Sequence, residues 1–204
     1  MTCGSGAPPL PPPPPPAAAA RAVREAAQAV AGAWTQPVDP ESFSRAISQL
    51  HSVLRDLGIA TRGLARYQTA GNPADPAPPR FRQAVTASAE RLLGAGQRLS
   101  GVLAAEGLGP VPDPDEPGAM LCRASRTAIT AWRQPAGTSI DRDATIEQLI
   151  TAIGFLDLAT RNLTAYAPRR RAIDLNVVAA SLTDATSCLA GTIPSSAHPT
   201  DGAE

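Results

Sequence analysis

The sequence lacks lysine, has no excess of either charge and contains few aromatic residues. Its 18 basic side chains are all arginines, and they balance 18 acidic side chains in a chain of 204 residues. No net field therefore favours nucleic acid, a membrane surface or acidic substrates. The aromatic content of 3% argues against a β-sandwich or β-barrel. The length suits one domain or two small ones with a sizeable core.

Cysteine and histidine are also scarce. Cys3, Cys122 and Cys188 are far apart in sequence, which excludes a disulfide framework and a zinc knuckle. With His51 and His198 as the only histidines, we expect no metal site and no cofactor. The N-terminus lacks a secretory pattern, and no stretch approaches the ~20 apolar residues that span a bilayer. These absences predict a soluble, cytoplasmic protein.

Proline is abundant at the N-terminus. It fixes φ and lacks the N–H donor, so residues 1–20 are predicted to form a Pro/Ala-rich disordered or polyproline II arm. Such an arm is either a ligand for an aromatic groove on a partner or a stiff spacer, and we favour the spacer. The composition of residues 194–204 predicts a disordered tail.

An internal repeat is the most informative feature of the sequence. AWTQP at 33–37 recurs as AWRQP at 131–135, and ATRGLARY at 60–67 recurs as ATRNLTAY at 159–166. Both tryptophans and both tyrosines fall at equivalent positions. These matches predict a tandem duplication, with a first repeat at 21–106, a Pro/acidic connector at 107–118 and a second repeat at 119–193. Counterparts are related by shifts of 98, 99 and 90 residues in the first, second and third helices of each repeat.

Apolar residues in both repeats recur at steps of three and four, which predicts three amphipathic helices per repeat. Asp39 before Pro40 resembles a helix N-cap, and Thr138 with Asp141 resembles a capping box. The short QP connectors predict that the first two helices of each repeat are antiparallel neighbours. We therefore expect an all-α fold, in which two three-helix units pack about a pseudo-twofold axis as one six-helix bundle.

Polar and aromatic residues shared by the repeats are candidates for binding a partner. Tryptophan is favoured in binding hot spots, and an arginine can present its guanidinium to a carboxylate or phosphate. Packing within the repeat explains the same residues more simply, and we favour it. The candidates are Trp34, Trp132, Arg62, Arg161, Tyr67 and Tyr166.

Catalytic patterns are missing from the sequence. It has no Gly-rich phosphate loop, no nucleophile elbow, no HExxH motif and no carboxylate–histidine pairs at ferritin-like spacing. We expect His51 to be a core-edge or solvated side chain, and Cys122 and Cys188 to be small buried ones. The prediction is therefore that the chain is not an enzyme.

The favoured hypothesis is a non-enzymatic helical interaction or adaptor protein, an accessory component of a larger bacterial assembly with a protein partner. One alternative is a nucleic-acid-associated factor that uses Arg66, Arg169, Arg170 and Arg171 together with the repeated arginines. The small supply of cations and the lack of interleaved aromatics make it less favoured. Another is a small-molecule-binding domain with its site between the two units. The repeated motifs resemble those of small actinobacterial proteins, and this resemblance implies no function.

Overall fold

The computed structural model describes residues 12–35, 39–65, 79–104, 113–133 and 142–193. All regular structure in these ranges is α-helical, and the helices pack together through contacts between distant parts of the chain, so the prediction of an all-α helical bundle is confirmed. The helices are α1 (Pro16–Ala33), α2 (Pro40–Leu64), α3 (Pro79–Ala104), α4 (Pro117–Ala131), α5 (Arg142–Tyr166) and α6 (Arg169–Ala190).

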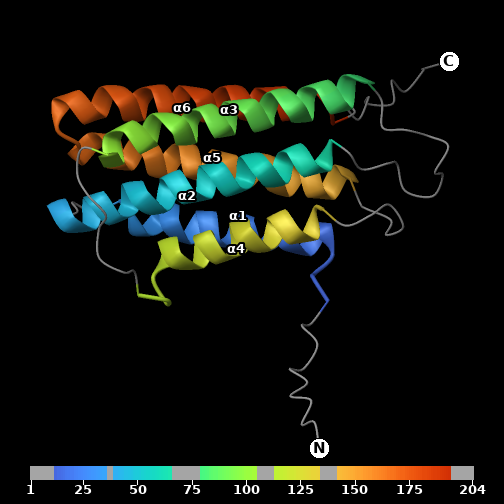
Figure 1. Cartoon of the computed structure of the whole chain (residues 1–204), viewed down its shortest axis with the longest axis horizontal. Coiled ribbons are helices and arrows are strands. Elements are labelled where there is room, and N and C mark those ends of the chain that lie inside the picture. The colour runs from blue at the N-terminus through green and yellow to red at the C-terminus, as the bar shows by residue number, and fades with distance from the viewer. Residues whose placement is uncertain (1–11, 36–38, 66–78, 105–112, 134–141, 194–204) are drawn as a thin grey trace, which may run out of the picture.

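The six helices form three layers of two, each layer joining one helix from each predicted repeat (Figure 1). The outer layers are α1 with α4 and α3 with α6, and the middle layer contains α2 and α5. Within each repeat, α2 packs on α3 and α5 packs on α6. Exchanging the first three helices with the last three leaves this set of packed pairs unchanged, as the predicted pseudo-twofold axis requires.

The first helix of each repeat packs on the second helix of the other repeat, so α1 lies against α5 and α4 lies against α2. The prediction that the first two helices of a repeat are packed neighbours was wrong, because α1 and α2 do not form a packed pair. A short connector fixes the distance between two helix ends, but it does not determine which faces pack. The apolar stripe of each first helix therefore packs on the second helix of the other repeat.

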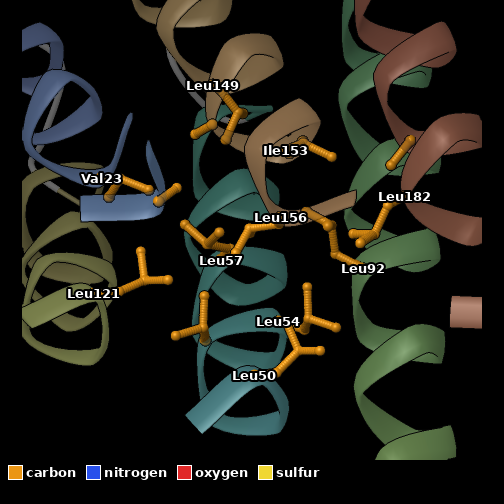
Figure 2. Packing of buried hydrophobic residues seen from close by; sticks show 14 of the residues in the cluster. Val23, Leu50, Leu54, Leu57, Leu92, Leu121, Leu149, Ile153, Leu156 and Leu182 are labelled. Atoms are coloured by element: carbon orange, nitrogen blue, oxygen red, sulfur yellow. The ribbon is translucent and has the colours of Figure 1, made fainter. Parts of the chain in front are cut away.

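The core lies between the layers and receives side chains from all six helices (Figure 2). Counterparts are buried alike: Leu57 and Leu156 are fully buried in the middle layer, and Leu92 and Leu182 are fully buried in the layer above. At about 25 cal/mol for each Å² of apolar surface removed from water, this shared core is the main source of stability.

The start of α2 agrees with the prediction from the sequence, whereas the start of α1 differs from it. Asp39 caps α2 as expected, since its Oδ1 accepts hydrogen bonds from the backbone N–H groups of Glu41 and Ser42, both at 3.0 Å. These bonds and the Ser42 hydroxyl lower the pKa of Asp39. α1 already begins at Pro16, inside the range assigned to the disordered arm. Proline is tolerated in the first helical turn, and the following alanines are strong helix formers. The capping box predicted at Thr138 lies outside the described residues.

Candidate functional site

The two repeated tryptophans are buried in the core, with exposed fractions of 6% for Trp34 and 1% for Trp132. Each follows the last residue of its helix, and its backbone N–H closes the final helical turn. The indole Nε1 of Trp132 donates a hydrogen bond to the backbone oxygen of Pro16 at 3.1 Å. The burial of both side chains agrees with the packing interpretation. Neither tryptophan presents an exposed surface to a partner, so their role in partner binding stays a prediction.

Among the other repeated candidates, Tyr166 fixes α5 to the end of α1. The hydroxyl of Tyr166 donates to the backbone oxygen of Thr35 at 2.9 Å, and Asn162 beside it donates to Ala31 at 3.3 Å. Both bonds fix the C-terminal end of α1 to α5. Tyr67 and Arg66 lie outside the described residues.

The described arginines proposed for nucleic-acid binding lie on three helices, α2, α5 and α6. Arg169 and Arg170 are exposed in the first turn of α6, and Arg171 is half-buried. Arg62 lines a groove between α2 and α3, whereas Arg161 lies on α5.

A groove between α2 and α3 combines a hollow with several polar side chains. It has a volume of about 480 Å³ and is open to solvent. One wall comes from α2, where His51, Arg55 and Arg62 recur at helical spacing along one face. The other wall comes from α3 and contains Glu90, Leu93, Gly94, Gly96, Gln97 and Ser100.

The counterpart of this face in the second repeat carries the opposite charge balance. Arg161 is held there by the carboxylate of Asp157, with Nε–oxygen distances of 3.0 and 3.1 Å, and by the hydroxyl of Thr183 at 3.4 Å. The counterparts of these two partners in the first repeat are Gly58 and Leu93. Arg62 consequently has no hydrogen-bond or ion-pair partner among the described residues.

A second substitution acts in the same direction. The groove residue Gly94 corresponds to Asp184, whose carboxylate in the second repeat pairs with Arg91 across α3 and α6 at 4.0 Å. A Cβ atom on Gly94 would meet nothing within 4 Å. The first repeat therefore has two glycines where the second has two carboxylates, and its arginine is left facing an open groove.

A second, shallower groove runs along the other side of α3, between α3 and α6. It measures about 410 Å³ and is lined by Arg91, Arg98 and Ser181 together with three residues of the first groove. Those shared residues are Glu90, Gly94 and Gln97. Here we call the two grooves and the α3 surface between them the α3 face. Its four arginines, Arg55, Arg62, Arg91 and Arg98, outnumber its one acid, Glu90.

The electrostatics of the first groove favour an anion. Burial, and then the charge of Arg55, lower the pKa of His51, so this imidazole is neutral at pH 7 and can still donate a hydrogen bond. The charge of Arg55 is partly balanced by the carboxylate of Asp56, since Arg55 Nε lies 3.9 Å from Asp56 Oδ1. Arg62 provides the unshared positive charge.

A polar seam also runs between α2 and α4. The carboxylate of Asp56, 8% exposed, lies 3.7 Å from Arg126 Nε, and burial raises its pKa. Burial also raises the pKa of the neighbouring Cys122 to about 11, so this thiol stays protonated and is no nucleophile at neutral pH. The seam joins two packed helices and offers no open site.

Sequence reasoning identified Arg62 but missed the residues around it. The signal was present in the comparison of the repeats, because Gly58 and Gly94 replace Asp157 and Asp184 while the arginine is retained. Periodicity alone could not show that α3 brings Glu90 and Gln97 to the same groove. Identical residues reveal the repeat, whereas the groove lies where the two repeats have different residues.

Comparison with protein-family models, curated proteins and solved structures finds no match to this chain. No helix of the described ranges is both long and apolar enough to cross a membrane. The described residues also contain no group of three or more His, Cys, Asp or Glu side chains that could hold a metal ion.

Proposed function

We propose that this chain is a non-enzymatic helical interaction protein that binds a partner protein through the α3 face. The observation that carries the proposal is the difference between the two faces around a retained arginine. Arg161 is held within its own repeat, whereas Arg62 faces a groove and has no partner among the described residues.

The shape of the face supports a protein partner. Two adjoining grooves that share Glu90, Gly94 and Gln97 form a long, shallow surface. Small-molecule pockets enclose most of the ligand surface and are mostly lined by apolar residues, whereas this surface is open and most of the residues that line it have polar side chains. Weak, transient protein contacts use surfaces of this type.

The proposed role as an accessory component of a larger bacterial assembly, and the cytoplasmic location, remain predictions. A partner retained only through nucleic acid would instead favour the Arg-rich alternative. The experiment below separates the two.

The test is affinity capture from a lysate of the source organism with the purified full-length chain, in the presence and absence of nuclease. Gly94→Gln fills the floor shared by the two grooves without adding charge. Gly154→Gln is the matched control, because Gly154 is an exposed glycine in the middle of α5 with nothing within 4 Å of its Cβ position.

We expect nuclease-resistant capture of a protein that is lost with Gly94→Gln and retained with Gly154→Gln. Circular dichroism should show equal helicity for both variants. Capture that is unaffected by Gly94→Gln, or that disappears with nuclease, would overturn the proposal.

A further inference from the structure

The chemistry of the α3 face also defines what occupies it. We propose that the occupant is an extended acidic segment of the partner protein, whose carboxylates pair with the arginines along α2 and α3. This inference rests on the proposed function and adds the chemical class of the partner. The inference depends on the charge and spacing of the arginines and on the hydrogen-bonding capacity of the face.

The arginines of the face form two rows with the same spacing. Arg55 and Arg62 are seven residues apart on α2, and Arg91 and Arg98 are seven residues apart on α3. Seven residues of α-helix rise about 10 Å. In a polyproline II segment, which has three residues per turn and rises about 3.1 Å per residue, residues three apart lie on the same side and about 9 Å apart, so an acid at every third position matches either row.

The packing of α2 on α3 sets how the two rows align along the face. Gly96 lies beside the backbone of His51 and Arg55, and the Cβ position of Gly58 contacts Leu93. α2 and α3 are therefore antiparallel here, so Arg55 lies level with the end of α3 that carries Arg98. Arg62 lies toward the end that carries Glu90 and Arg91. An acidic segment between the rows has a cation on either side at each end.

Uncharged and acidic groups on the face favour a peptide over a nucleic acid. Gln97 provides both a donor and an acceptor for peptide groups, and Glu90 can accept from a backbone N–H. Nucleic-acid affinity also depends on the number of phosphates neutralised, and four arginines with Glu90 among them provide little of it.

The probe is a fluorescein-labelled peptide that repeats Glu-Gly-Ser, with the same repeat of Gln-Gly-Ser as its neutral control. Binding to the full-length chain is measured by fluorescence anisotropy. We expect the acidic peptide to bind with an affinity that falls as salt is added, because the pairs are solvent-exposed. Binding of the neutral peptide should be at least about tenfold weaker, which corresponds to the loss of two exposed ion pairs.

Two matched pairs of variants locate the peptide. Arg62→Ala should weaken binding about fivefold, whereas Arg161→Ala, which removes an arginine already held by Asp157, should leave it unchanged. Gly94→Asp should weaken binding much more than Gly94→Asn, which has the same shape without the charge. Arg62 is exposed, so its variant provides the test even if the Gly94 variants fail to fold.

A spectroscopic readout reports on the groove itself. A carboxylate bound beside His51 favours the imidazolium, so the His51 pKa should rise when the acidic peptide is added. An NMR pH titration follows the His51 ring protons, with His198 as the only other histidine signal. No rise in the His51 pKa would show that the peptide binds elsewhere.

The other possible outcomes separate a failure of the acidic occupant from a failure of the proposed function. Equal loss with Gly94→Asp and Gly94→Asn, or equal binding of both peptides, would overturn the acidic occupant. If Gly94→Gln still abolishes capture of a protein in that case, the proposed function survives alone. Tighter binding of a single-stranded oligonucleotide, or displacement of the peptide by millimolar inorganic phosphate, would assign the face to a phosphate ligand and overturn the inference.

Discussion

The molecule contains the same helix–helix contact twice, with different chemistry. α1 packs on α5 and α4 packs on α2, each joining a first helix to the second helix of the other repeat. In the α2–α4 contact, Asp56 lies near Arg126, whereas the counterparts in the α1–α5 contact are Phe155 and Gln28. Phe155 packs on the core as a partly buried side chain.

The difference shows which positions a duplicated fold must retain. Buried leucines need only a matching volume in the neighbouring layer, and they are retained in both halves. A buried carboxylate needs a neighbouring cation on the facing helix, and only one half provides one at this contact. Divergence between the halves is therefore concentrated at polar positions, including those of the α3 face.

The largest effect should come from the tryptophans, which the two halves share. Replacing Trp34 or Trp132 with alanine removes a buried aromatic side chain, and we expect each change to cost about 3–5 kcal/mol of unfolding free energy. Trp132→Ala should cost more, because it also removes the hydrogen bond to Pro16. Urea unfolding followed by circular dichroism measures both.

The double variant should lose most of its helicity at 25 °C, because the two costs together approach the stability of an ordinary domain. A double variant that stays folded but fails to capture a partner would instead restore the hypothesis that both tryptophans are binding anchors.

Two glycines at non-equivalent positions test the cost of a close backbone approach. A Cβ atom on Gly63 would lie 2.9 Å from the backbone oxygen of Trp132, whereas one on Gly154 would meet nothing within 4 Å. We expect Gly63→Ala to cost about 1–3 kcal/mol by overpacking, and Gly154→Ala to add about 0.8–1 kcal/mol through helix propensity. Thermal melts of both variants measure the contrast, and equal melting temperatures would contradict it.

Close approach of this kind marks the limit of what the sequence could predict. Steps of three and four identified the buried stripe, including Leu57 and Leu156, because burial on a helix has a regular period. The choice of partner helix has no such local signal, so α1 was wrongly expected against α2. The groove was missed for the same reason, since its walls on α2 and α3 come together only after these helices have packed.

Asp56 tests the polar contact through its pH dependence. Burial raises its pKa in the folded state above the unfolded value, so between these two values the folded protein holds a proton that the unfolded chain has released. The free energy of unfolding therefore falls as pH rises through that window, and the loss persists above it.

Asp56→Asn cannot ionise and should lack this fall, so its stability relative to the wild type should be greater at pH 7 than at pH 3. Urea midpoints measured across this range provide the check. A relative stability that instead decreases with pH would show that the ion pairs with Arg55 and Arg126 outweigh burial.

The smallest effect concerns the pair that distinguishes the two faces. Asp157 and Arg161 form an exposed ion pair four residues apart on α5, and such pairs contribute about 0.3–0.5 kcal/mol. A double-mutant cycle with Asp157→Asn and Arg161→Ala should give this coupling at low salt and almost none in 1 M salt, where charges are screened beyond about 3 Å. This small coupling energy bears on the binding proposal, because Arg62 differs from Arg161 only if Asp157 already holds Arg161. A coupling of zero at low salt would make the two arginines equally available, and Arg161→Ala could then no longer be used as the silent control for Arg62→Ala.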